Sequence, residues 1–194
     1  NFWQQKIKSK TLLERTIETC LKSTLIEILV IACDNPKAED YLNKYDDIRL
    51  RFFLRDPKST ARFKNLLGSL EKIALNIDPE MSGITVSVFC QAPFITTETV
   101  DETITTLLFN DTDCAFGVER VDSQLLRRTH DGLVPINKRG NVESDYDIIY
   151  RDSETCFATK NKNFLNGELK GATIANFEIS TPESFFIQSE HHLN

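Results

Sequence analysis

The sequence of 194 residues suits a single globular domain, with 40% hydrophobic and 27% charged residues. Its net charge is −6 and no basic tract stands out, so the composition argues against a nucleic-acid-binding groove. No apolar stretch approaches the roughly 20 residues that a membrane-spanning helix needs, and no signal-peptide pattern is present. We therefore expect one cytoplasmic domain over residues 1–194.

Alternating helical and strand patterns fill the N-terminal half. In chain order they predict a helix over 10–23, a strand over 25–32, a short helix over 37–45, a strand over 48–54 and a helix over 60–77. The apolar run at 25–32 is broken only by Glu27, which indicates a strand covered on both faces.

The C-terminal half continues the alternation. The patterns predict a strand over 84–90, a helix over 97–109 with Thr97 as its N-cap, strands over 114–118, 154–160 and 173–179, and a closing helix over 181–193. Residues 120–150 interrupt this rhythm with a polar stretch that carries turn signals at Asp131-Gly132 and Arg139-Gly140-Asn141. The five cysteines are odd in number and have no CxxC spacing, so we expect reduced, buried thiols rather than a metal or disulfide site.

Strands separated by helices predict βαβ units, a mostly parallel sheet and a three-layer α/β/α architecture. In such sheets ligands bind beyond the carboxyl ends of the strands. The loops of interest therefore begin near Cys33, Arg55, Gln91 and Glu119. No glycine-rich phosphate loop or other common nucleotide motif occurs, so these patterns alone leave the function open.

Six segments, in order, resemble the acylneuraminate (sugar-acid) cytidylyltransferase family, whose members are CMP-N-acetylneuraminic acid synthetase-like. They are SKTL with TIE (9–12 and 16–18), ILVIACD (28–34), FLRDP (53–57), FCQAPFI (89–95), YRDS (150–153) and EISTPE (178–183). On this alignment the family's first strand and its R-x-G-S-K phosphate loop would lie upstream of Asn1, so the domain is expected to be N-terminally incomplete.

The resemblance implies a Rossmann-like fold similar to the nucleotide-diphospho-sugar transferases, with residues 120–152 protruding to form a homodimer contact. It implies transfer of CMP from CTP to an acidic nine-carbon sugar, either acylneuraminate, legionaminate or pseudaminate, with release of pyrophosphate. Such transfer requires alignment and cations that neutralise charge at phosphorus, so Mg²⁺ is the expected cofactor.

The resemblance also points to individual site residues. Arg55 would contact the nucleotide, although a surface ion pair with Asp56 is an equal alternative. Asn1 would contact the cytosine unless the terminus is frayed, and Ser59 would touch ribose or phosphate. Gln91 would bind the sugar acid, or else satisfy the backbone of its own loop.

The expected metal ligands are Glu178 and Asp34, because Mg²⁺ prefers carboxylate oxygens. The family's second aspartate in this segment is Ser180 here, which supplies no charge and suits a capping box with Glu183 instead. Ser180 and the absent loop leave open a catalytically impaired nucleotide-binding or dimer-partner paralogue. Another sugar nucleotidyltransferase is a further alternative by fold analogy, because Pro93-Phe94-Ile95 also resembles a P-F-I segment of those enzymes.

Overall fold

The computed structural model describes residues 2–56, 66–136 and 148–189. Its helices are η1 (Phe2–Gln4), α1 (Leu12–Lys22), η2 (Pro36–Lys44), α2 (Leu66–Ile77), α3 (Thr97–Asn110) and α4 (Lys162–Leu165), where η marks a 3₁₀ helix. Its strands are β1 (Lys6–Ile7), β2 (Lys10–Thr11), β3 (Leu29–Cys33), β4 (Leu50–Leu54), β5 (Ile84–Val88), β6 (Cys114–Arg120), β7 (Leu126–Thr129), β8 (Gly132–Pro135), β9 (Tyr150–Lys160) and β10 (Ile174–Glu178). None of the described helices has the length and apolar character needed to cross a membrane.

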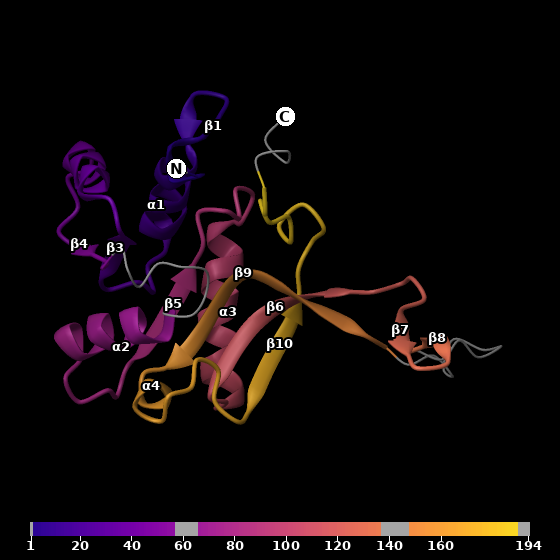
Figure 1. Ribbon diagram of the computed structural model, residues 1–194. Coiled ribbons are helices and arrows are strands. Elements are labelled where there is room, and N and C mark those ends of the chain that lie inside the picture. Colours follow the sequence, from indigo (N-terminus) through magenta and orange to yellow (C-terminus); the bar gives the residue numbers. More distant parts are fainter. Residues whose placement is uncertain (1, 57–65, 137–147, 190–194) are drawn as a thin grey trace.

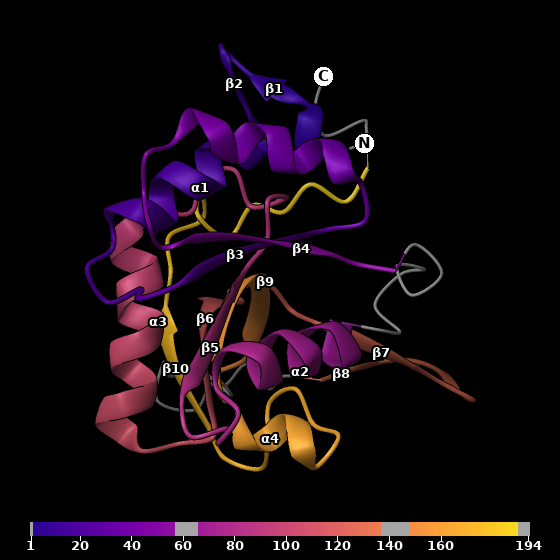
Figure 2. The same cartoon turned by 90° about the vertical axis from the view of Figure 1, so that its left-hand side faces the viewer.

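The predicted α/β architecture is confirmed, and the main strands form two groups (Figures 1 and 2). Four strands pair in the order β10–β6–β9–β5, and β3 pairs separately with β4. The pairs β3–β4 and β6–β10 are parallel, whereas β9 runs antiparallel to both of its neighbours. Among the described residues no ladder joins β3 to β5, so the sheet is divided between an N-terminal and a C-terminal half.

The C-terminal half is built by packing α3 on the four-stranded sheet. Leu107 of α3 is fully buried and lies in one cluster with Ala115, Ala158 and Ala175 from three adjacent strands. Because these strand residues are small, the helix can approach the sheet closely. The helix begins at Thr97 as predicted, but its N-cap is Thr96 rather than Thr97: the Thr96 hydroxyl accepts from the Thr99 backbone N–H at 3.2 Å, while the Thr97 hydroxyl donates to the Thr19 carbonyl.

The N-terminal half packs α1 and η2 around β3 and β4. A capping box fixes the start of α1, since the Thr11 hydroxyl accepts from the Glu14 backbone N–H and the Glu14 carboxylate accepts from the Thr11 backbone N–H. Ile17 on the same helix is fully buried beside Trp3 and Ile31. At the far end Arg49 donates to the carbonyls of residues 21, 23 and 26, which joins the end of α1 to the start of β4.

The predicted closing helix over 181–193 is wrong for the described residues. A turn occupies 181–184 and an irregular segment follows to residue 189. The physical reason is that consecutive aromatic residues contact different partners: Phe185 packs on Phe94 and Phe186 packs on Phe89. The Ile187 N–H donates to the Gln91 carbonyl at 2.9 Å, so its backbone hydrogen bond goes to a loop rather than to a helix.

The predicted protrusion is confirmed, and Figure 1 shows it as an arm that extends away from the body. The described part of the arm includes the β7–β8 hairpin, whose turn residues His130 and Asp131 overlap the predicted turn signal at Asp131-Gly132. The second turn signal, at Arg139-Gly140-Asn141, lies outside the described residues. The homodimer contact assigned to residues 120–152 stays a prediction.

Candidate functional site

A cavity of about 1850 Å³ lies between β3 and β5. Asp34, Arg55 and Gln91 line it, and each follows the carboxyl end of a strand: β3, β4 and β5 respectively. The expectation that these three positions belong to one site is therefore consistent with their placement.

Arg55 is held in place by a backbone hydrogen bond to the end of β3 and a side-chain hydrogen bond to α2. Its backbone N–H donates to the Cys33 carbonyl at 2.8 Å, which extends the β3–β4 pairing by one residue. Its side-chain Nε donates to the Ser69 hydroxyl of α2 at 3.1 Å, and the residue is half-buried. A guanidinium fixed at the end of a strand in this way can present donors to phosphate oxygens.

Gln91 lies in a loop that is restrained from two sides. Its carbonyl accepts from Ile187 of the C-terminal segment, and Arg15 of α1 donates to the carbonyl of Pro93 at 3.1 Å. The side-chain Oε1 of Gln91 lies 3.5 Å from the Cys90 thiol. The loop backbone is thus fixed by other residues, and the amide is left at the cavity wall.

The two carboxylates expected to bind metal are not brought together. Asp34 is exposed at the cavity, next to β3. Glu178 lies on β10, at the opposite edge of the four-stranded sheet, where the Tyr150 hydroxyl donates to it at 2.9 Å. Within the described chain no group of three or more His, Cys, Asp or Glu side chains could hold a metal ion. The residues present do not form a common two-carboxylate site, and magnesium binding stays a prediction.

Ser180 and Glu183 are hydrogen-bonded to each other, but not in the predicted capping box, and no helix follows in the described residues. The Ser180 hydroxyl donates to the Glu183 carboxylate at 2.7 Å, and the Ser180 carbonyl accepts from the Glu183 N–H at 3.0 Å. The same carboxylate accepts from the hydroxyls of Thr96 and Thr99. Burial raises the pKa of Glu183, but the hydroxyls of Thr99, Ser180 and Thr96 outweigh this and hold the pKa below its usual value. Glu183 therefore anchors the C-terminal segment to the start of α3.

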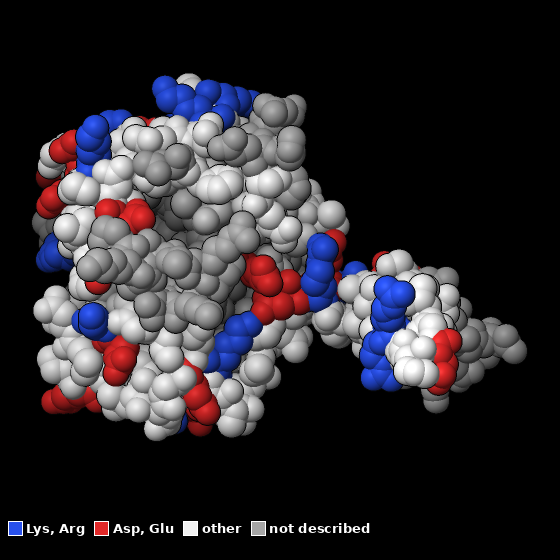
Figure 3. Space-filling view, viewed as in Figure 1, with Lys and Arg blue, Asp and Glu red and all other residues white. Residues whose placement is uncertain are grey.

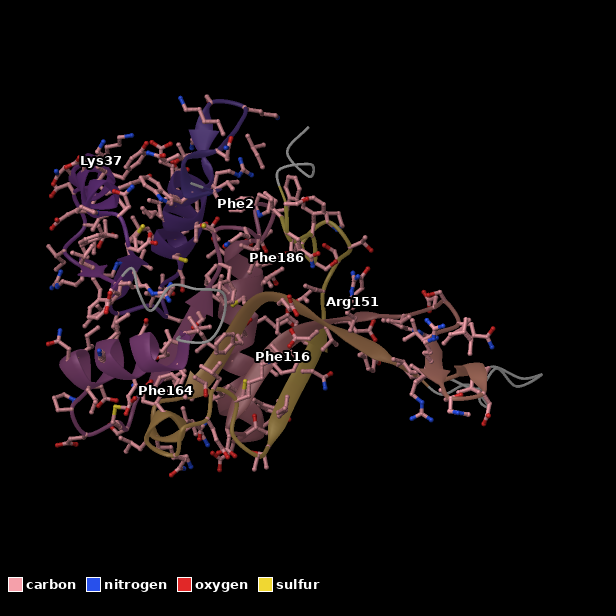
Figure 4. All side chains as sticks on the ribbon, in the orientation of Figure 1. Phe2, Lys37, Phe116, Arg151, Phe164 and Phe186 are labelled. Carbon is pink, nitrogen blue, oxygen red and sulfur yellow. The ribbon has the colours of Figure 1, made fainter. Side chains whose placement is uncertain are left out.

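A second polar group lies at the carboxyl end of β6, where the sequence predicted a loop of interest near Glu119 but not the partners of that residue. Glu119 accepts from the Arg151 guanidinium and, at 3.0 Å, from the Ser184 hydroxyl. The hydrogen bond from Arg151 is the main reason that the pKa of Glu119 is lowered. Figure 4 shows Arg151 where the arm leaves the body, so this group ties the arm, β6 and the C-terminal segment together. No local pattern indicates it, because its three members are separated in sequence.

The remaining predictions concern Asn1, Ser59 and the five cysteines. Asn1 and Ser59 lie outside the described residues. All five cysteines are free, as predicted, and Cys20, Cys114 and Cys156 are buried. Cys33 and Cys90 line the cavity, and burial raises the pKa of the Cys90 thiol to about 11. These thiols are therefore protonated at neutral pH and are poor nucleophiles there.

Comparisons with known proteins give two findings. The family model described as cytidylyltransferase matches residues 4–189. Among solved structures, the chain is similar to 4-diphosphocytidyl-2C-methyl-D-erythritol synthase from Anaerococcus prevotii, with a TM-score of 0.69 and 16% sequence identity over 97% of this chain and 85% of that one. At this identity the likeness concerns the fold. No match was found among curated proteins.

Proposed function

Because the chain belongs to the cytidylyltransferase family, we propose that it transfers CMP from CTP to an acidic nine-carbon sugar, either acylneuraminate, legionaminate or pseudaminate. In this reaction a sugar hydroxyl oxygen bonds to the α-phosphorus of CTP. The bond from that phosphorus to the bridging oxygen of the β-phosphate breaks, and pyrophosphate leaves with the electron pair. The hydroxyl proton passes to solvent.

One observation carries the proposal. Asp34, Arg55 and Gln91 line a single cavity at the carboxyl ends of three strands, which is where α/β sheets bind ligands. They supply a carboxylate, a guanidinium and an amide, so the rim combines groups suited to a metal–triphosphate complex and to a polar sugar. The sequence resemblance supports the choice of an acidic sugar.

Each residue has a proposed role. Arg55 binds nucleotide phosphate oxygens and offsets the charge that develops on the leaving pyrophosphate. Gln91 donates its amide N–H to the sugar carboxylate. A Mg²⁺ ion would neutralise the triphosphate, and Asp34 is the described carboxylate at this cavity that could contact it.

Pyrophosphate release from CTP tests this function directly. The assay pairs CTP or UTP with each of the three acidic sugars and with a phosphorylated 2C-methyl-D-erythritol, the acceptor implied by the name of the structural neighbour. We expect turnover with CTP and an acidic sugar and none with UTP. Turnover only with the phosphorylated polyol would overturn the proposed substrate while leaving cytidylyl transfer intact.

A catalytically impaired paralogue is the second candidate, because the Ser180 hydroxyl is engaged by Glu183 rather than open to a metal. In that case CTP binds and no pyrophosphate is released with any acceptor. Titration calorimetry with CTP alone, in the presence of Mg²⁺, separates this outcome from a failure to bind nucleotide.

We also propose that the arm forms a homodimer contact. Leu126, Leu133 and Ile136 on the β7–β8 hairpin are all more than half exposed, at 51%, 65% and 51%. Apolar groups gathered on a projecting hairpin are typical of an interaction surface. Figure 3 shows basic side chains on the same arm; Arg127 and Arg128 are exposed there.

The double substitution Leu126→Ser with Leu133→Ser should convert a dimer to a monomer in light scattering at micromolar concentration. The control is Leu165→Ser, since Leu165 is 59% exposed but lies on the body. A wild-type protein that is strictly monomeric would contradict this proposal.

A further inference from the structure

The long strand β9 is irregular beside the candidate site. Its ladder with β6 runs to Phe157 and resumes only at Asp152. The four residues between them, 153–156, stand opposite the single residue Gly117 of β6, so β9 bulges here. A bulge bends its strand and re-aims the side chains on it, and bulges are frequent next to active sites.

Glu154, within this bulge, has a backbone conformation that is unfavourable for its residue type. Its φ is 57°, in the left-handed region where a residue with a Cβ is strained. The Glu154 N–H donates to the Asp152 carboxylate at 2.9 Å, which holds the bulge in this conformation. Strained residues persist only where the surrounding structure imposes them, and they concentrate at binding and active sites. A role for the Glu154 side chain in ligand binding would account for this strain.

The bulge places Glu154 beside the loop that contains Gln91. The antiparallel ladder of β5 and β9 continues past its last pair through a hydrogen bond from the Phe89 N–H to the Thr155 carbonyl, 3.2 Å long. One residue further along each strand, Glu154 comes opposite Cys90, which directly precedes Gln91. Glu154, Cys90 and Gln91 all line the cavity. An acidic side chain therefore borders the cavity next to the amide that is proposed to bind the acceptor.

The carboxylate of Glu154 is available to a ligand. Glu154 is exposed, and its side chain forms no hydrogen bond or ion pair with the residues that the structure describes. Neighbouring carboxylates are engaged instead. Asp152, at the edge of the bulge, is paired with Lys170. Glu119 on β6 is paired with Arg151. Glu154 is thus an acidic group of this region that a molecule in the cavity can reach without breaking an ion pair.

We propose that Glu154 binds hydroxyl groups of the acceptor sugar and excludes acceptors with a phosphate at this position, an inference that rests on the proposed function. A carboxylate accepts hydrogen bonds from hydroxyls, and it repels a phosphate monoester, which carries about 1.5 to 2 negative charges at pH 7. An acidic nine-carbon sugar has one carboxylate, which Gln91 would bind, and several hydroxyls that can donate to Glu154. The bulge would thereby select a carboxylated polyol over a phosphorylated one.

Titration calorimetry with the acceptors tests the proposal. CMP replaces CTP in these titrations, so no transfer takes place and binding is measured alone. Glu154→Gly removes the side chain and should weaken binding of the acidic sugar that the wild type prefers by about 10- to 150-fold, the loss expected for hydrogen bonds to a charged group. Glu154→Gln keeps an acceptor oxygen without its charge. It should strengthen binding of the phosphorylated 2C-methyl-D-erythritol about five- to tenfold, because the repulsion of the phosphate is removed.

Thermal melts separate this role from a purely structural one. Glycine adopts a φ near 57° without strain, so Glu154→Gly should raise the Tm by about 2–4 °C while it weakens binding. Asp111→Gly is the matched control, because Asp111 has a φ of 51° at the C-terminal end of α3 and does not line the cavity. Loss of its exposed ion pair with Lys160 should change little. This control should raise the Tm by a similar amount and leave the binding of both acceptors unchanged.

Failure of this inference can be told apart from failure of the proposed function. Unchanged binding of both acceptors in Glu154→Gly and Glu154→Gln would overturn the role of Glu154, even if the wild type releases pyrophosphate from CTP. A wild type that binds none of the acidic sugars would overturn it as well. The expected changes in binding, in a protein that releases no pyrophosphate with any acceptor, would overturn the proposed transfer and leave the role of Glu154 in place.

Discussion

The two halves of the molecule differ in how their strands are held. In the C-terminal half, four hydrogen-bonded strands pack against α3 with a small-residue surface from β6, β9 and β10. In the N-terminal half, β3 and β4 form a pair that depends on α1 and η2 for its core. In the candidate site, Gln91 comes from the C-terminal half, and Asp34 and Arg55 come from the N-terminal half. The geometry of the site therefore depends on the junction between the C-terminal half, with its four-stranded sheet, and the N-terminal half, where β3 and β4 form a separate pair.

The largest effect on stability should come from the C-terminal half. Leu107→Ala removes a fully buried side chain from between the helix and the sheet, and should lower the free energy of unfolding by about 2–5 kcal/mol. Urea denaturation measures it. The control is Leu108→Ala on the same helix, which is 59% exposed and should change the free energy by no more than about 0.5 kcal/mol.

Ile17→Ala makes the corresponding change in the N-terminal half, where Ile17 is also fully buried. Because few backbone hydrogen bonds join the halves, we expect faster hydrogen exchange in α1, β3 and β4 and unchanged exchange in β6 and β9. If Ile17→Ala speeds exchange equally throughout, the two halves unfold as one unit and the comparison is wrong.

The next effect concerns the site. Loss of a charged hydrogen bond to the nucleotide in Arg55→Ala should cost about 1.5–3 kcal/mol, which is roughly a 10- to 150-fold loss in kcat/KM for CTP. Gln91→Ala should instead weaken use of the sugar, by a smaller factor. Steady-state kinetics with each substrate varied in turn separates the two roles.

Arg51→Ala is the matched control for Arg55→Ala, because Arg51 is an exposed arginine on the same strand whose guanidinium donates to the carbonyls of Ile48 and Leu50. It should leave both kinetic constants unchanged. Equal losses for both substrates in Arg55→Ala and Gln91→Ala, with both variants folded, would contradict the assignment.

The smallest effect concerns acid stability of the N-terminal half. A hydrogen bond from Lys44, followed by those from Thr11, lowers the pKa of Glu14 to about 2. Since the folded pKa lies below the ordinary value of 4.5, the stabilisation is present above pH 4.5 and is lost as the pH falls toward 2.

Glu14→Gln keeps the capping geometry but loses the ion pair, so it should cost roughly 1 kcal/mol at pH 7. Thermal melts between pH 7 and pH 2 should show the variant and the wild type converging below pH 4.5. A constant difference in Tm across that range would exclude this role for Glu14.

Much of the fold was predictable because the hydrophobic patterns of short segments indicate its helices and strands. The apolar stripe of α1 and the strand runs at β5 and β6 depend on neighbouring residues, and the carboxyl-end rule placed Asp34, Arg55 and Gln91 at one cavity. The division of the sheet was not readable from these patterns, because pairing partners far apart in sequence decide it. The pairing of Glu178 with Asp34 depends on strand order in the same way, and the structure sets their strands far apart.

The predicted closing helix over 181–193 shows a second limit of prediction from local sequence patterns. The sequence near residue 181 has the start signals of a helix, with Pro182 and the Ser180–Glu183 pair in place. Contacts of Phe185 and Phe186 with separate parts of the body, and the hydrogen bond from Ile187 to Gln91, outweigh that local preference. Tertiary packing thus overrides a local signal where a segment closes over the site.

Hydrogen exchange during a CTP titration tests most directly the claim that both halves build one nucleotide site. We predict slower exchange at residues 33–35 and 55–56 from the N-terminal half and at 89–92 from the C-terminal half, all with the same dependence on CTP concentration. The β7–β8 hairpin should not change. Protection confined to one half, or centred on another part of the molecule, would contradict the account.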